Sequence, residues 1–83
     1  MKDIVILGLH ITDRIKEVSA VQNVLTKFGC SIKTRIGLHD ADEEYNSSDG
    51  IILLELVGDK DEMIKLENAL RTIEGLKVQK MAF

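Results

Sequence analysis

The chain has 83 residues, which is enough for one domain, residues 1–83, that buries about 60–65% of its unfolded surface. Its net charge of −3 excludes a general attraction for nucleic-acid backbones or anionic membranes. A single cysteine excludes an intrachain disulfide, and the first apolar run is too short for a signal peptide or a membrane span, so we expect a cytoplasmic protein. Aromatic residues are only 4% of the chain, which predicts an aliphatic core.

The first half of the chain predicts a strand, a helix and a second strand. The run DIVILGL at residues 3–9 is apolar and rich in β-branched residues, as in the central strand of a sheet. Asp13 then precedes a helical stripe of apolar residues that Gly29 closes. SIKTRIGL at 31–38 alternates apolar and charged side chains, which predicts an edge strand with one wet face. Cys30, between the predicted helix and this strand, is expected to pack as a small apolar side chain.

The second half repeats this pattern. GIILLELVG at 50–58 is apolar on both faces except at Glu55, which predicts a second central strand. Asp59 and Glu62 form a capping-box-like D-x-x-E before a helical stripe that ends at Gly75, and LKVQKM follows as an edge strand. Two strand–helix–strand halves predict an α+β chain of order β-α-β-β-α-β. This is the ferredoxin-like fold, a four-stranded antiparallel sheet with two helices on one face.

A polar loop, GLHDADEEYNSSDG at 37–50, joins the halves. We expect the first and third strands to be parallel neighbours, which puts this loop at the end opposite the first strand-to-helix turn. His10 at that turn and His39 in the loop would then lie roughly 20 Å apart, too far to share a metal. The carboxylates that follow Asp40 do not fit a calcium loop, because Tyr45 stands where an EF-hand needs glycine. The loop is therefore expected to be mobile and free of metal.

The polar residues do not predict catalysis. One cysteine and two separated histidines cannot form the Cys/His or Ser/His/Asp sets of nucleophilic catalysis. The third strand carries no aromatic ring on which a nucleic-acid base could stack, and the chain has no basic arm. We therefore expect no enzyme activity, no cofactor, no metal, and no direct contact with nucleic acid or membrane.

The order of a strand, D-x-x-x-x-V at a helix start and a glycine before the second strand resembles the ACT domains of regulatory proteins. More closely, SIKTRIGLH, a loop, GIILLELVGD and IEGLKVQKM resemble the small ACT-like iron-only hydrogenase system regulators, whose fold is compared with the C-terminal domain of the nickel-responsive repressor. The resemblance spans essentially the whole chain and implies an oligomeric, ligand-responsive regulatory module. Nickel binding of the repressor's kind is not expected. The repressor's site needs several histidines and a cysteine around the second and third strands, and in this chain only His39 lies near them.

The resemblance also implies where an effector would bind. In ACT-like assemblies the effector lies where the first strand-to-helix turn of one subunit meets its neighbour, a junction that supplies concavity. Here the turn offers donors, acceptors and both charges in His10, Thr12, Asp13 and Arg14. A carboxylate beside free helix-end amides suits a small zwitterion such as an amino acid. Each residue also has an ordinary interpretation, as an N-cap in the case of Asp13 or as a surface residue in the case of His10.

The sheet face that the helices leave open predicts assembly. Both central strands are apolar on both sides, so about five large aliphatic side chains would face solvent whichever side meets the helices. A homodimer or tetramer stacked through this face would bury them. The residues expected at this interface are Ile4, Ile6, Ile51, Leu53 and Val57.

Two functions remain open from the sequence. The first is a ligand-sensing module that acts as a homo-oligomer in transcriptional or metabolic regulation, through a separate protein partner. The alternative is a purely structural oligomerisation or protein-interaction module without a small-molecule ligand.

Overall fold

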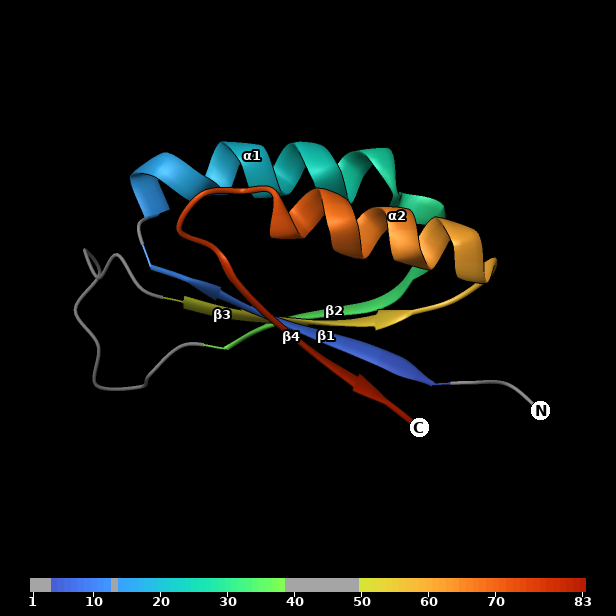
Figure 1. Cartoon of the computed structure of the whole chain (residues 1–83). Coiled ribbons are helices and arrows are strands. Elements are labelled where there is room, and N and C mark those ends of the chain that lie inside the picture. The colour runs from blue at the N-terminus through green and yellow to red at the C-terminus, as the bar shows by residue number, and fades with distance from the viewer. Residues whose placement is uncertain (1–3, 13, 39–49) are drawn as a thin grey trace.

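The computed structural model describes residues 4–12, 14–38 and 50–83, with only the course of the main chain for 14–16. The four strands form one sheet in the order β2-β3-β1-β4, and every neighbouring pair is antiparallel. Both helices cover the same face of this sheet (Figure 1), so the expected ferredoxin-like fold is confirmed. The elements are β1 Val5–Ile11, α1 Arg14–Lys27, β2 Ile32–Leu38, β3 Gly50–Leu56, α2 Lys60–Arg71 and β4 Lys77–Ala82.

The direction of the two central strands differs from the expectation. They are antiparallel rather than parallel, with Val5 opposite Leu56 and Ile11 opposite Gly50. The reason lies in the connections: the crossover through α1 makes β2 parallel to β1, and β3 then runs back against β2. The turn from β1 to α1 and the beginning of β3 therefore lie at the same end of the sheet.

This correction removes the argument that kept the two histidines apart. His10 is paired with Ile51, and Ile51 is paired with Leu38 on the next strand. The expectation that a strand length separates His10 from His39 therefore loses its basis. His39 and the rest of the loop at 39–49 lie outside the described residues, and the expectation of a mobile, metal-free loop stays a prediction.

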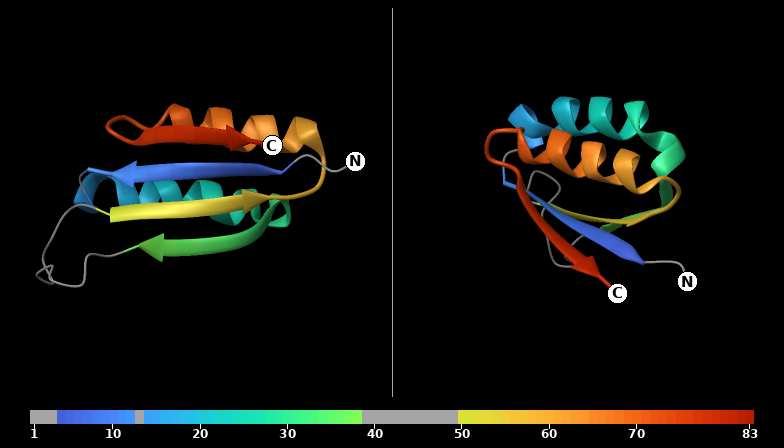
Figure 2. Two further views of the ribbon diagram at one scale, coloured as in Figure 1. Left: turned by 90° about the horizontal axis from the view of Figure 1, so that it is seen from below. Right: turned by 45° about the vertical axis from the view of Figure 1, so that its right-hand side comes forward.

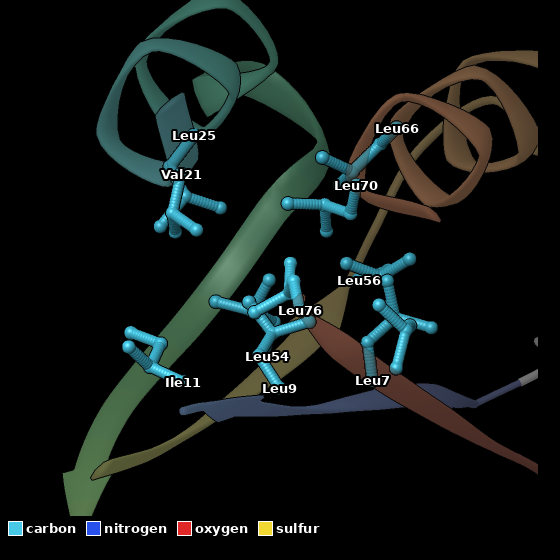
Figure 3. Packing of buried hydrophobic residues seen from close by; sticks show 11 residues of the cluster. Leu7, Leu9, Ile11, Val21, Leu25, Leu54, Leu56, Leu66, Leu70 and Leu76 are labelled. Carbon is cyan, nitrogen blue, oxygen red and sulfur yellow. The ribbon is translucent and has the colours of Figure 1, made fainter. Parts of the chain in front are cut away.

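The core lies between the two helices and one face of the sheet (Figure 3). Leu7 and Leu9 of β1 and Leu54 of β3 point toward the helices, because alternate residues of a strand share a face. Leu66 and Leu70 of α2 meet them from above. This cluster is almost wholly aliphatic, as the composition predicts.

Different features of the chain mark the beginning and the end of α2. At its start, the side chain of Asp59 accepts a hydrogen bond from the amide of Asp61 at 2.8 Å, which satisfies one of the free helix-end donors. Glu62, the expected second member of a capping box, pairs with Lys65 at 3.4 Å. The helix ends at Arg71, earlier than the Gly75 expected from the sequence, and a turn carries the chain to β4.

A short 3-10 turn at Gly29–Ser31 joins α1 to β2 and changes the expected position of Cys30. Ser31 is buried in this turn, and its carbonyl accepts a hydrogen bond from the amide of Val57 at 2.8 Å. The thiol of Cys30 is exposed instead of packing as an apolar side chain. The turn therefore directs a small polar residue inward and the cysteine outward.

A β-bulge changes the face on which β2 presents its apolar residues. Ile32 is opposite Leu56 on the helix side, but the register shifts before Thr34, which is opposite Glu55. The bulge turns Ile36 and Leu38 away from the helices. Their side chains were expected to lie on the protected face of an edge strand, and both are exposed.

We expect the substitution Leu66→Ala to lower the free energy of unfolding by about 2–5 kcal/mol, because it empties a fully buried leucine position. Ile64→Ala on the same helix is the matched control, because Ile64 is 53% exposed. It should change the free energy of unfolding by only about 0.5 kcal/mol. Urea denaturation measures both. Equal losses would show that the helix does not bury the face assigned to it.

Candidate functional site

Of the four residues expected to form an effector site, the structure describes the side chains of His10 and Thr12. His10 lies in β1 on the face away from the core, half-buried between Ile51 and Lys77. Thr12 follows β1 and turns toward the helices. Arg14 begins α1, but its side chain lies outside the described part of the chain, as does the whole of Asp13. The structure therefore describes two of these four side chains, and they are directed to different faces.

A buried glutamate holds Thr12 in place. Glu17 of α1 is only 2% exposed, and its two carboxylate oxygens accept from the amide and the hydroxyl of Thr12 at 3.1 and 2.9 Å. The hydroxyl also lies 3.0 Å from the carbonyl oxygen of Gly75, in the turn between α2 and β4. These contacts tie together the end of β1, the first turns of α1 and the beginning of β4. The polar atoms of Thr12 are thus engaged within the chain.

Glu17 was not identified as a site residue from the sequence, although a signal for it exists. It lies four and eight residues before Val21 and Leu25, so the three share one face of α1. Both of these apolar residues are buried in the core. A carboxylate in an otherwise apolar row of a helix needs a hydrogen-bond partner when it is buried, and Thr12 supplies it.

A hollow of about 270 Å³ lies at the same end of the molecule, between α1 and the strands β2 and β3. Gly37 and Gly50 leave it open because they have no side chains, while Ile11 and Val21 give it an apolar wall. Arg35 stands beside it and donates to the side-chain oxygen of Gln22 at 3.3 Å. The hollow is slightly smaller than the range of about 300–1,000 Å³ for ligand sites, so only a small molecule would fit.

The sheet face away from the helices is the second candidate site. Seen from below in Figure 2, the four strands lie in front of the helices and no described element covers them. Ile6, Ile51 and Leu53 lie on this face by strand alternation, and their place in an interface stays a prediction. Ile4 and Val57 lie at one end of it, where they also line a groove beside α2.

Apolar side chains occupy much of this open face. Ile51 is 43% exposed, and Leu53 packs its side chain over the bare Cα of Gly8 in the neighbouring strand. The edge strands add aliphatic side chains that the sequence analysis did not assign to this face. The large apolar residues here that are about half exposed are Ile36, Leu38, Ile51 and Met81.

A polar group marks the limit of the apolar area. Glu55 lies on β3, where its carboxylate is 3.9 Å from the ammonium of Lys33 and 3.4 Å from the hydroxyl of Thr34. These contacts are largely exposed, and exposed ion pairs contribute only about 0–1 kcal/mol each. They therefore define the border of the apolar surface more than they stabilise the fold.

A metal site and a membrane-spanning helix find no support in the described part of the chain. Within residues 4–12, 14–38 and 50–83, no three His, Cys, Asp or Glu side chains come together so that they could hold a metal ion. Neither of the two described helices is long and apolar enough to cross a membrane.

Comparisons with known proteins support the fold more than any activity. No family model and no curated protein matches the chain. Among solved structures, the chain is similar to an uncharacterized protein from Thermotoga maritima, with 28% identity, a TM-score of 0.80 and 99% of each chain covered. This similarity extends over both chains from end to end.

Two more distant structures share the fold alone. One is a formyltetrahydrofolate deformylase from Pseudomonas putida, with 16% identity and a TM-score of 0.59; the match covers 96% of this chain but 29% of the deformylase. The other is a nitrogen regulatory PII-like protein from Thiomonas intermedia, with 11% identity, a TM-score of 0.53, and 99% and 92% of the two chains covered. Small ferredoxin-like domains are thus the structural neighbours of this protein.

We expect Gly75→Ala to destabilise the protein more than Gly58→Ala does. Both glycines have positive φ, 85° and 93°, so each alanine costs about 1–2 kcal/mol in the main chain. Only at Gly75 would the new Cβ lie 2.7 Å from a carboxylate oxygen of Glu17, whereas nothing lies within 4 Å at Gly58. Displacing that buried carboxylate should add about 1–3 kcal/mol. Equal losses in urea denaturation would mean that the contact of Glu17 with Thr12 contributes little.

Proposed function

We propose that this protein is a small regulatory module that assembles through its open sheet face and responds to a small effector. The observation that carries the proposal is the group of half-exposed aliphatic side chains on a face that no described element covers. Contiguous apolar surface of this kind is typical of sites where proteins associate. The fold shared with a PII-like regulatory protein is consistent with a regulatory role, although the likeness extends only to the fold.

A second copy of the chain suits this face by its size. A standard interface covers about 800 Å² on each partner, which is roughly one seventh of the 5938 Å² surface of this chain. Four strands spaced about 4.8 Å apart, three of seven residues and one of six, give a face of roughly 19 by 23 Å before side chains are added. The open face therefore provides most of the contact that a homodimer needs, and further contacts at the sheet edges would give a tetramer.

The gain from apolar burial and the cost of association are of similar size for this face. Fully burying a large aliphatic side chain contributes about 1.5–3 kcal/mol, and neighbours already shield about half of each one here. Four such residues on each of two chains then contribute about 6–12 kcal/mol, against an association cost of about 4–15 kcal/mol. The partly exposed Ile6 and Leu53 add to the favourable side. We therefore expect a reversible assembly whose population depends on concentration.

The effector site belongs to the end of the sheet where β1 meets α1. The residues proposed to bind the effector are His10, Thr12, Asp13 and Arg14, with Asp13 as the partner of an ammonium group. Support comes from the hollow at this end, where Arg35 could receive the carboxylate of the same zwitterion. An amino acid has both groups and is small enough for the space. Its binding would change how two copies pack against each other.

The regulatory output is proposed to pass through a protein partner in the cytoplasm. The described side chains contain no assembled catalytic set, and we propose that the protein is not an enzyme and needs no cofactor. The chain has a net charge of −3, so direct binding to nucleic acid or to an anionic membrane is not part of the proposal. Transcriptional or metabolic regulation would then depend on the partner.

The alternative function is a structural oligomerisation module without a ligand. The engaged state of Thr12 favours it, because the amide and the hydroxyl already have partners in Glu17 and Gly75. In that case the turn from β1 to α1 would serve only to fix the helix on the sheet. The open face would then be the whole functional surface.

We expect light scattering to show a dimer or tetramer at about 100 µM. At this concentration an association free energy of about 6 kcal/mol is sufficient for most chains to be assembled. Ile51→Glu should give a monomer, because it places a carboxylate in the apolar face. Ile64→Glu is the matched control, since Ile64 is similarly exposed but lies on α2. A wild-type monomer at this concentration, or equal assembly of the two variants, would contradict the proposal.

The effector is tested by a thermal-shift screen of the twenty amino acids. An amino acid present at 100 times its Kd should stabilise the native state by about 2.7 kcal/mol. Asp13→Asn should abolish this gain, because asparagine caps a helix as well as aspartate does but cannot pair with an ammonium group. Arg14→Ala should weaken it as well.

Asp59→Asn, the same change at the start of α2, is the control and should leave the effect of the amino acid unchanged. If no amino acid raises the melting temperature, the ligand-free structural module is the better description. If one does and both turn variants respond like the wild type, the effector lies elsewhere.

A further inference from the structure

The open face of the sheet has a regular arrangement of polar and apolar side chains. Because alternate residues of a strand share a face, the strand pairings place the outward residues in rows that cross the sheet. Each row takes one residue from each strand, in the order β2, β3, β1 and β4, and Figure 2 shows this face from below. The rows are Thr34, Glu55, Ile6 and Met81; then Ile36, Leu53, Gly8 and Gln79; then Leu38, Ile51, His10 and Lys77.

The polar residues of this face occupy two diagonally opposite corners. Thr34 and Glu55 stand at one corner, on β2 and β3, where the hydroxyl lies 3.4 Å from the carboxylate. His10 and Lys77 stand at the other corner, on β1 and β4. One corner therefore carries a carboxylate and the other an ammonium group. An apolar band runs between the two corners along the other diagonal, and its residues are Ile36, Leu38, Ile51, Leu53, Ile6 and Met81.

This pattern restricts how a second copy can lie on the face. In a symmetric pair stacked face to face, the two-fold axis lies between the two sheets and parallel to them. Each residue then lies over its mirror position across the axis. Sheets that pack nearly aligned, at about 30°, need an axis close to the strand direction or to its perpendicular. Both choices put polar corners on apolar ones, because Glu55 of one copy would lie over Ile6 or Ile51 of the other.

Orthogonal stacking, at about 90°, places the axis along a diagonal of the face, and polar groups then meet polar groups. An axis along the polar diagonal brings each corner onto the same corner of the other copy. Glu55 would face Glu55 and Lys77 would face Lys77, which is unfavourable for like charges. An axis along the apolar band exchanges the corners instead, so Glu55 of each copy lies beside Lys77 of the other. Charge thus selects one of the two orthogonal arrangements.

We propose that two copies stack orthogonally through the open face, with the two-fold axis along the apolar band and Glu55 of each copy beside Lys77 of the other. This arrangement rests on the assembly proposed above and adds the residues that make it selective for a second copy of this chain. The axis crosses the central pair Gly8 and Leu53, where glycine has no side chain to hold the sheets apart. The apolar bands cover each other, and the two charge pairs lie at opposite edges.

Contacts within the chain leave both charged groups able to pair in this way. The carboxylate of Glu55 lies 3.9 Å from the ammonium of Lys33, whose side chain is 64% exposed. A pair this long and exposed contributes little, and a carboxylate has acceptor sites for a second donor. Lys77 is exposed, and its ammonium pairs with no other side chain in the described part of the chain.

The first test exchanges the charges and measures the Kd of the dimer by sedimentation equilibrium of the full chain. Glu55→Lys and Lys77→Glu each turn opposite-charge contacts into like-charge contacts, so each should raise Kd by about tenfold. The double variant restores opposite charges and should return Kd to within about threefold of the wild type. Lys65→Glu makes the same charge change on α2 and is the control, which should assemble like the wild type.

The second test locates the axis by cross-linking with a short bismaleimide. A Cys30→Ser background removes the exposed native thiol. Met81→Cys in this background places the two new thiols beside the axis, so two chains should be linked. Thr34→Cys lies on the same face but at a polar corner, where the axis carries it away from its own counterpart, and it should not be linked.

The results separate this arrangement from the assembly on which it rests. A wild-type monomer would overturn both. If the wild type assembles, an unchanged Kd in the single variants, or no recovery in the double variant, overturns the arrangement alone. Absence of linking at Met81→Cys, or equal linking at Thr34→Cys, also overturns it, because the axis would then not follow the apolar band.

Discussion

Two helices cover only one face of a four-stranded sheet here, and most of the surface chemistry follows from this constraint. Right-handed crossovers place α1 and α2 on the same side, so side chains that alternate along β1 and β3 meet two different environments. Leu7 and Leu54 enter a closed aliphatic core, while their neighbours Ile6 and Leu53 face outward. Both sets are apolar in sequence, so the fold has more apolar surface than its own helices can bury. A small domain of this kind is complete as a fold but has an unused apolar face.

The two ends of the sheet differ in how their polar groups are arranged. At the end of β1, Glu17 is buried and accepts two hydrogen bonds from Thr12, so this carboxyl group is held inside the fold. At the beginning of β1, the charges lie at the surface around an apolar floor, and Glu67 fixes the position of Lys80. One end thus has a closed hydrogen-bond network beside a small hollow, and the other has a wide groove with lysines at its rim. The two ends of this domain of 83 residues thus differ in their surface chemistry.

The sequence predicts the fold better than it predicts the surfaces. Runs of β-branched residues and two helical stripes are local signals, so the six main elements and their common fold could be predicted. The direction of β3 relative to β1 is a property of the connections, and the expectation of parallel strands was wrong. The side on which Ile36 lies depends on the bulge before Thr34, which the alternation of apolar and polar residues does not reveal. The larger groove could not be predicted at all, since its lining comes from the four strands and α2, which are far apart in the chain.

The bulge in β2 decides which side chains the open face of the sheet presents. Lys33 is the extra residue in a strand that otherwise pairs regularly with β3. If the strand paired without a bulge, with Lys33 opposite Glu55, Arg35 would stand on the outer side of the sheet, and Ile36 and Leu38 would turn toward α1. Removal of Lys33 alone would make the pairing regular and leave each of these side chains on its present face. The apolar character of this edge of the sheet therefore depends on register as well as on composition.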